Sequence, residues 1–238
     1  IIDTARGAGE ILRQLYGKDH QVEHKGVIDL VTEADKRSED YILDRILTAF
    51  PDHGIMAEES GEQRLDNGQR WYIDPLDGTN NFAHDLPIFC VSIAYAENGR
   101  VEMGVIYDPM LDECFYAERG GGFHINGSQT RISQETELIN SLLVTGFPYN
   151  IQSTTNTNLE NFGKFAMLTQ GVRRLGSAAL DIAYVAAGRF DGYWEIGIKP
   201  WDIAAGTVMV EEAGGIITDL SGDPDYMKPP YAIVTANP

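Results

Sequence analysis

The sequence predicts a layered α/β protein, with an N-terminal α+β half followed by a C-terminal α/β half. Three observations predict this class: two helical segments come first, a series of strand segments joined by turns follows, and strands and helices then alternate. The pattern changes near residues 125–135, so we expect the halves to span 1–130 and 131–238. A chain of 238 residues, 43% of them apolar, is long enough to bury a sizeable core.

In the first half, two helices are expected to precede the strands. Apolar residues at helical spacing predict an amphipathic helix over residues 1–16. A second helix is expected from about Asp35 to Ala49, because Thr32-Glu33-Ala34-Asp35 has the form of a capping box. A polar loop is expected over 61–70 and a short helix from Thr79. Strands are predicted at 54–60, 71–74, 88–97, 101–107 and 113–118, with a hairpin turn at Asn98-Gly99.

In the second half, strand and helix segments alternate. Helices are expected over 158–169, 178–187 and 202–213, and the last of these stops at Gly214-Gly215. Strands are predicted at 141–147, 191–196, 215–220 and 231–237. This alternation is typical of a layered α/β arrangement.

The strongly negative charge limits the partners of this chain. Acidic residues outnumber basic ones by 36 to 18, which gives a formal charge of −18. Such a charge repels nucleic acid and anionic membranes, so neither is expected as a partner. A negatively charged substrate would need bound cations that reverse the local sign.

The cysteines and the lack of targeting signals indicate the compartment. Cys90 and Cys114 lie within apolar strand segments, so we expect two small buried side chains in a reducing environment. The sequence contains no signal peptide and no apolar run of the ~18–20 residues that a membrane span requires. By elimination we expect the cytoplasm. Because the first residue is Ile1 rather than Met, we also expect that the natural start is missing.

Four places in the chain end a strand or start a helix on a carboxylate: Asp35, Glu58, Asp74 with Asp77, and Asp202. Each has a purely structural alternative. Asp35 has the place of a capping-box acid, Asp77 and Asp202 could be helix N-caps, and Glu58 could simply be solvated. Functional acids in layered α/β proteins gather at strand ends, which favours a shared site.

The residue types in this group are those that bind magnesium and phosphate. Mg²⁺ takes oxygen ligands, and Asp74-Pro75-Leu76-Asp77 places two carboxylates and a backbone carbonyl around one turn. Such a turn can bridge two ions about 3.5–4 Å apart. Gly78-Thr79 then offers backbone N–H groups at a helix start, where anions bind. The acids would recruit Mg²⁺, and Mg²⁺ would recruit phosphate.

These segments resemble the inositol monophosphatase family over nearly the whole chain. Asp74-Pro75-Leu76-Asp77-Gly78-Thr79 with Asn81-Phe82 resembles its first signature. Trp201-Asp202-Ile203-Ala204-Ala205-Gly206, ending in Glu212-Ala213-Gly214-Gly215, resembles its second. Asp29-Leu30-Val31-Thr32 with Asp35, and Glu58-Glu59-Ser60, match its other elements in order. The resemblance implies a layered αβαβα sandwich, usually a homodimer, and Mg²⁺-dependent, lithium-sensitive hydrolysis of phosphate monoesters.

The resemblance also implies roles for individual residues. Two or three Mg²⁺ ions would be held by Glu58, Asp74, the Leu76 carbonyl, Asp77 and Asp202. Gly78 and Thr79 would contact the phosphate. Asp35 with Thr79 would orient or deprotonate the attacking water, and Glu58 would assist. Glu195 and the segment Gly176-Ser177-Ala178 would contact the alcohol part of the substrate.

Some positions depart from the family pattern and keep the substrate open. Lys199-Pro200 stands where animal members often carry His-Cys, and Arg173-Arg174 stands where one Arg is usual. Glu195 favours a polyol, so inositol 1-phosphate is the expected substrate. The extra cation Lys199 keeps NADP 2′-phosphate, fructose 1,6-bisphosphate and 3′-phosphoadenosine 5′-phosphate as alternatives. A glycosidase that uses two of these acids, and a metal-dependent binding protein, are the alternatives from other classes.

Overall fold

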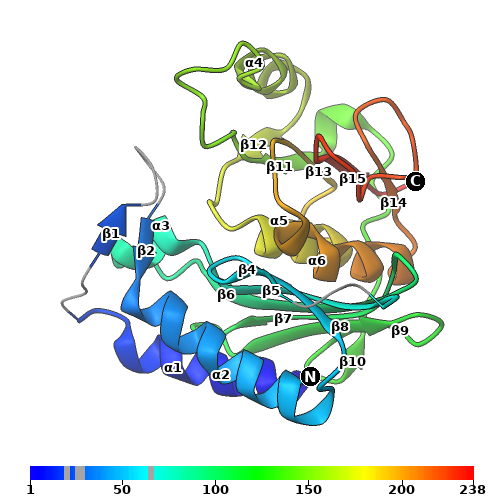
Figure 1. Ribbon diagram of the computed structural model, residues 1–238. Coiled ribbons are helices and arrows are strands. Elements are labelled where there is room, and N and C mark those ends of the chain that lie inside the picture. Colours follow the sequence, from blue (N-terminus) through cyan, green and yellow to red (C-terminus); the bar gives the residue numbers. More distant parts are fainter. Residues whose placement is uncertain (19–21, 25–29, 64–66) are drawn as a thin grey trace.

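The computed structural model describes residues 1–18, 22–24, 30–63 and 67–238. Asp29 of the resemblance, and residues 64–66 of the expected loop, lie outside these ranges. Figure 1 shows the elements stacked as helices, sheet, helices, sheet and a last helix, which confirms the predicted αβαβα layers. The helical layers are α1 (Ile2–Leu15) with α2 (Glu33–Ala49), then α5 (Ala178–Ala186) with α6 (Pro200–Glu212), then α4 (Leu159–Leu168).

The first sheet has eight strands in the order β10-β9-β8-β7-β6-β5-β3-β4. Its strands are β3 (Gly54–Ala57), β4 (Gly61–Gln63), β5 (Gln69–Asp77), β6 (Cys90–Glu97), β7 (Arg100–Asp108), β8 (Glu113–Glu118), β9 (Gly122–Ile125) and β10 (Ser128–Gln129). All neighbours are antiparallel except β3 and β5, where Ala57 lies opposite Ile73. Because the two strands are parallel, Glu58 comes to lie level with Asp74.

The strand that carries the two aspartates differs from its predicted form. The prediction ended it at Asp74, but β5 continues to Asp77, with an irregular register between Asp74 and Asp77. Pro75 explains the irregularity, because it has no N–H for the ladder and strands accept proline at bulges. The bulge turns the backbone of Leu76 out of the regular sheet pairing. The short helix α3 (Thr79–Ala83) follows as expected.

Several short strands were not predicted from the sequence. Part of the expected loop 61–70 is β4, which pairs with β3 after the turn at residues 58–60. The other missed strands are β9, β10 and β12 (Gly171–Arg173), and β1 (Val22–His24) pairs with β2 (Leu30–Thr32) in a separate ribbon. Each has only two to four residues, too few for a period-2 pattern to stand out.

The second sheet has five strands in the order β12-β11-β13-β15-β14. The strands not yet given are β11 (Leu142–Thr145), β13 (Gly192–Ile196), β14 (Ile216–Thr218) and β15 (Ala232–Ala236), and a 3₁₀ turn (Leu138–Asn140) precedes β11. Helix α6 begins at Pro200, two residues before the predicted start, because proline is well suited to the first helical position.

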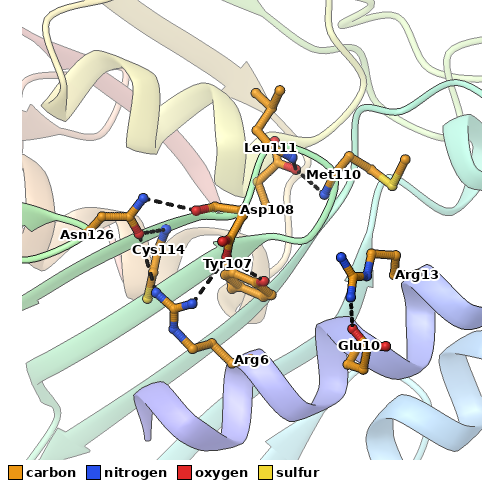
Figure 2. A network of polar contacts seen from close by, with 10 residues as sticks. Arg6, Glu10, Arg13, Tyr107, Asp108, Met110, Leu111, Cys114 and Asn126 are labelled. Atoms are coloured by element: carbon orange, nitrogen blue, oxygen red, sulfur yellow. Dashed lines mark hydrogen bonds and ion pairs between the residues drawn. The ribbon is translucent and has the colours of Figure 1, made fainter.

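A polar network joins α1 to the turn between β7 and β8 (Figure 2). The guanidinium of Arg6 donates to Asp112, at 3.1 Å, and to the side-chain carbonyl of Asn126. Buried Asp108 accepts the N–H groups of Met110 and Leu111, which closes the turn between β7 and β8. The first helical layer is therefore attached to the sheet by polar contacts as well as by its apolar face.

The core consists of two apolar clusters on the two faces of the first sheet. One cluster packs α1 and α2 against the sheet, and the other fills the space from the sheet through α5 and α6 to the second sheet. Cys90 and Cys114 are buried and free, as predicted. Across the described residues, no helix has both the length and the apolarity to cross a membrane. At Gly104 the backbones of β7 and α6 touch: a Cβ there would lie 2.6 Å from the Ala205 carbonyl oxygen.

Substituting Gly104 should therefore destabilise the fold by moving α6. We expect Gly104→Ala to lower the free energy of unfolding by roughly 1–3 kcal/mol, because backbone atoms cannot yield to the added methyl. Gly163→Ala in α4 is the matched control, since a Cβ there meets nothing within 4 Å. It should leave stability unchanged or raise it by up to ~1 kcal/mol. Urea unfolding of both variants tests this; equal effects would contradict the close packing.

Candidate active site

The structure gathers the predicted site residues in one cleft formed by two adjoining pockets. The smaller, of about 210 Å³, is lined by the acids Glu58, Asp74, Asp77 and Asp202, with Leu76, Gly78 and Thr79. The larger, of about 450 Å³, adds Ser177, Ala178 and Glu195 and shares Asp77, Gly78, Thr79 and Asp202. Asp35 is in hydrogen-bond contact with Thr79. The segments that meet here are far apart in sequence.

The acids of the smaller pocket repel one another. Burial, followed by the charges of Glu58, Asp77 and Asp202, raises the pKa of Asp74 well above its usual value. Burial, followed by Asp77 and Glu58, does the same for the pKa of Asp202. Both groups thus experience an excess of negative charge at close range. Such a site is complementary to a cation.

The carboxylates share the cleft without forming a closed cage. Within the described ranges, no group of three or more His, Cys, Asp or Glu side chains is placed so that it could hold a metal ion by itself. Two of the acids are turned toward backbone donors: Asp202 accepts the N–H of Lys199 at 2.9 Å, and Asp74 accepts that of Leu76 at 3.0 Å. Asp202 thus takes the structural role of a capping-box acid while lining the pocket.

One buried face of α2 holds the loops that carry the acids. Ser38 donates its hydroxyl to the Pro75 carbonyl at 2.8 Å, which fixes the bulge of β5. The Glu39 carboxylate accepts the N–H groups of Glu59 and Ser60 at 2.9 and 2.8 Å, which fixes the turn after Glu58. Ser38 and Glu39 lie three and four residues after Asp35, so all three share one face of the helix. Sequence reasoning missed Ser38 and Glu39.

Asp35 connects this face of α2 to Thr79. One carboxylate oxygen accepts the backbone N–H and the hydroxyl of Thr32, both at 2.7 Å, which confirms the predicted capping box. The other oxygen accepts the Thr79 hydroxyl at 2.9 Å, and the Leu76 carbonyl lies 3.0 Å from the same hydroxyl. Gly78 precedes Thr79 with φ +99°, and a Cβ there would lie 2.8 Å from the Ile88 carbonyl oxygen. Only glycine fits this position.

Asp77 binds the start of α5 as well as lining both pockets. Its carboxylate accepts the Ser177 hydroxyl at 2.6 Å and the N–H groups of Ala178 and Ala179 at 3.2 and 2.7 Å. Burial raises the pKa of Asp77, although these hydrogen bonds act in the opposite direction. The purely structural interpretation of Asp77 predicted that it would cap the helix that begins at Thr79. Asp77 caps α5 instead.

A second connection between the halves comes from Asn81. Its buried side-chain amide donates to the carbonyls of Ile88 and Leu175, at 2.8 and 2.9 Å. Leu175 directly precedes Gly176-Ser177-Ala178. The asparagine within the first signature therefore positions the segment that the resemblance assigns to the substrate alcohol.

Glu195 lies at the end of the cleft away from Glu58 and Asp74. It accepts the Tyr193 hydroxyl at 2.6 Å, and burial raises its pKa to about 7. Gly146 packs directly against it, since a Cβ at Gly146 would lie 2.1 Å from the carboxylate. Asp181 also lines this end of the pocket and was missed by sequence reasoning. Asp181 is the fourth residue of α5, and the helix dipole alone favours an acid in the first turn. The sequence therefore does not mark it as a site residue.

Comparison with known proteins shows the family to which the chain is similar. The family model described as "Inositol monophosphatase family" matches residues 1–238. "Nus factor SuhB" of Escherichia coli (strain K12) is 47% identical over 229 residues, covering 95% of this chain and 86% of that protein. "Inositol-1-monophosphatase" of Synechocystis sp. is 48% identical over 224 residues, covering 93% of this chain and 78% of that protein.

Solved structures show the same fold. The inositol monophosphatase from Anabaena (Nostoc) sp. is 45% identical, with a TM-score of 0.89 over 99% of this chain and 88% of that one. The crystal structure of 2′AMP-bound SaIMPase-II is 29% identical, with a TM-score of 0.82 over 99% of this chain and 86% of that one.

The raised carboxyl pKa values predict an unusual pH dependence for the chelator-treated protein. Because the pKa of Glu195 rises from 4.5 to about 7 on folding, the folded state holds more protons between these values. The free energy of unfolding should therefore fall as pH rises through this window, by roughly 1–3 kcal/mol. The matched variant Glu195→Gln lacks this titration. Urea unfolding of both proteins from about pH 5 to about pH 8 tests the idea; parallel stability curves would contradict it.

Proposed function

The chain belongs to the inositol monophosphatase family, and on that premise we propose that it hydrolyses small phosphate monoesters with Mg²⁺, inositol 1-phosphate above all. The observation that carries the proposal is the shared cleft. Four acids lie at one end of it, Asp35 with Thr79 lies beside them, and Glu195 lies at the other end. A phosphate ester placed along this cleft would meet cations, a base and a hydroxyl acceptor in that order.

The donor atoms at the acidic end are of the chemical type that magnesium binds. All of them are oxygens, the ligand type that Mg²⁺ prefers. Burial, followed by the charges of the neighbouring acids, raises the pKa of Asp74, and a bound cation would offset that repulsion. We assign Glu58, Asp74, the Leu76 carbonyl, Asp77 and Asp202 as ligands of two or three ions. Bound Mg²⁺ would stabilise negative charge on the phosphate and lower the pKa of a water.

The pair Asp35 and Thr79 is suited to moving a proton. While the Thr79 hydroxyl donates to Asp35, its oxygen keeps lone pairs that can accept a hydrogen bond from a water. As that water forms a bond to phosphorus and the P–O bond to the alcohol breaks, the water proton would pass to Thr79 and the Thr79 proton to Asp35, and the leaving alkoxide would take a proton from solvent. The Thr32 donors on the other oxygen keep Asp35 oriented. We assign Glu58 an assisting role in the same step.

The phosphate and the alcohol would lie on opposite sides of Asp77. Gly78 and Thr79 would face the phosphate, and Glu195 would accept a hydroxyl of the alcohol. Ser177 and Ala178 would shape the wall between them, with their own donors directed to Asp77. Family membership further supports lithium inhibition, a homodimer and a cytoplasmic location.

A nucleotide substrate is the second candidate, and the apolar wall of the larger pocket favours it. This wall consists of Phe147, Pro148, Tyr149, Ile151, Leu159 and Phe162. A flat base can pack on such a surface over a larger apolar area than a polyol. SaIMPase-II, which shares this fold, has been solved with 2′AMP bound. NADP 2′-phosphate and 3′-phosphoadenosine 5′-phosphate are the substrates of this type. Separately, Lys199 beside the smaller pocket favours a substrate with a second phosphate, such as fructose 1,6-bisphosphate.

A role without catalysis is the remaining alternative. It rests on the relatives named Nus factor SuhB and on the idea of a metal-dependent binding protein. The presence of every acid expected for catalysis favours the enzyme, because a pure binding role needs no base paired with Thr79.

The direct test is phosphate release from inositol 1-phosphate, NADP, fructose 1,6-bisphosphate and 3′-phosphoadenosine 5′-phosphate. Each is assayed with Mg²⁺, with chelator, and with Mg²⁺ plus lithium. We expect Mg²⁺-dependent, lithium-sensitive release that is fastest from inositol 1-phosphate. Fastest release from NADP or the adenosine phosphate would select the nucleotide alternative, and no release from any of them would reject the enzyme.

The hydrogen bonds that the Glu39 carboxylate accepts from the turn after Glu58 should control magnesium affinity. In Glu39→Gln, one backbone N–H of the turn after Glu58 loses its acceptor, which loosens Glu58. We expect the Mg²⁺ dissociation constant to rise roughly 10–100-fold, the usual effect of changing a group that supports a metal ligand. Titration calorimetry of Mg²⁺ into chelator-treated protein measures this. Glu62→Gln is the control, because Glu62 pairs with Arg70 at the surface. Equal effects of the two changes would refute this role of Glu39.

A further inference from the structure

The end of the cleft that holds Glu195, here called the alcohol end, contains a further acid, Asp181, that has no part in the proposed reaction. Asp181 lies one turn into α5, and its backbone N–H donates to the Ser177 carbonyl at 3.0 Å. The residue is 1% exposed, and it lines the same pocket as Ala178 and Glu195. A position one turn below Ala178 on the same helix face places Asp181 at the floor of this pocket.

One carboxyl oxygen of Asp181 lacks the partner that a buried acid normally has. Its Oδ1 is buried, and the described part of the chain supplies no hydrogen-bond partner for it. Buried polar groups are almost always paired, so an exception inside a pocket needs an explanation. Attraction to the helix start explains an acid at this position, but an exposed acid would serve that purpose without the cost of burial. A ligand that occupies the pocket would supply the missing partner.

Asp181 and Glu195 differ in what they can offer a ligand. Burial, followed by the charges of Glu195 and Asp77, raises the pKa of Asp181 well above its usual value, although Arg174 acts in the opposite direction. A protonated Asp181 can donate a hydrogen bond, and an ionised one can only accept. Glu195 already accepts the Tyr193 hydroxyl and keeps acceptor capacity for another donor.

We propose that Asp181 is a specificity-determining residue that, together with Glu195, binds two hydroxyl groups of a polyol phosphate at the floor of the pocket. The inference rests on the proposed phosphatase function and names the substrate class of the same site. A hydroxyl can accept from one carboxyl and donate to the other, so a ring with neighbouring hydroxyls satisfies both. A flat apolar group would leave Oδ1 of Asp181 buried and unpaired, which is a strong basis for discrimination.

The test compares two substrates that share a six-membered ring but differ in hydroxyl groups, inositol 1-phosphate and phenyl phosphate, at saturating Mg²⁺. In Asp181→Leu we expect kcat/KM for inositol 1-phosphate to fall about 10–100-fold, with phenyl phosphate changing less than about threefold. Asp181→Asn keeps a donor and an acceptor and should recover part of the loss. A general structural defect would lower both substrates equally, so the ratio of the two constants is the readout.

Thr235→Val is the matched control, because Thr235 in β15 also has a buried oxygen without a partner among the described residues but lies outside the pocket. It should leave the substrate ratio unchanged. Equal losses on both substrates in Asp181→Leu and Asp181→Asn, or no loss on either, would overturn the role of Asp181. A wild-type protein that cleaves phenyl phosphate but not inositol 1-phosphate would overturn the polyol class. A wild type inactive on both would reject the proposed function itself.

Discussion

The geometry of the cleft depends on the buried polar face of α2. Asp35, Ser38 and Glu39 would be costly in the interior if they were unpaired, and each is paired with a different loop of the site. The helix therefore sets the positions of Thr79, the Pro75 bulge and the turn after Glu58 together. A shift of α2 along its axis would displace all three, so the first helical layer controls the site as well as covering the sheet.

Asp77 faces two competing demands. It holds the start of α5 through three donors, and it lines the pocket in which cations are proposed to bind. A carboxylate oxygen has more than one lone pair, so both can be served by one side chain. The arrangement couples the halves of the chain, because any movement of Asp77 toward a ligand would pull on α5 and on the alcohol end of the cleft. Asn81 adds a second connection in parallel, from α3 to the segment before Ser177.

The alternation of strands and helices predicted a layered α/β class, and the acids at strand ends predicted their clustering, because both follow from local rules. The αβαβα order was an implication of the family resemblance. Strand ends of layered proteins share an edge, and the parallel pairing of β3 with β5 places Glu58 beside Asp74 for that reason. The short strands were missed because two to four residues carry little periodicity. Ser38, Glu39 and Asp181 were missed for another reason: each lies on a helix face that the pattern assigns to solvent or core, and only tertiary contacts reveal its partner. A polar residue three or four positions after the capping-box acid was the available signal for Ser38 and Glu39.

The two ends of the cleft are under different physical constraints. At the acidic end, repulsion among the carboxylates and the hydrogen bonds that hold their loops leave little freedom. Moving one acid changes the electrostatic energy of all of them. At the alcohol end, a floor of two carboxyls faces a wall of apolar side chains from the segment 147–162, and these surfaces favour different ligands. A ligand that satisfies the floor leaves the wall partly hydrated, whereas a ligand that covers the wall leaves Asp181 unpaired. An unpaired buried polar group costs about 1–3 kcal/mol, which is similar to the gain from fully burying one large apolar side chain, so the floor and the wall favour their ligands with comparable strength.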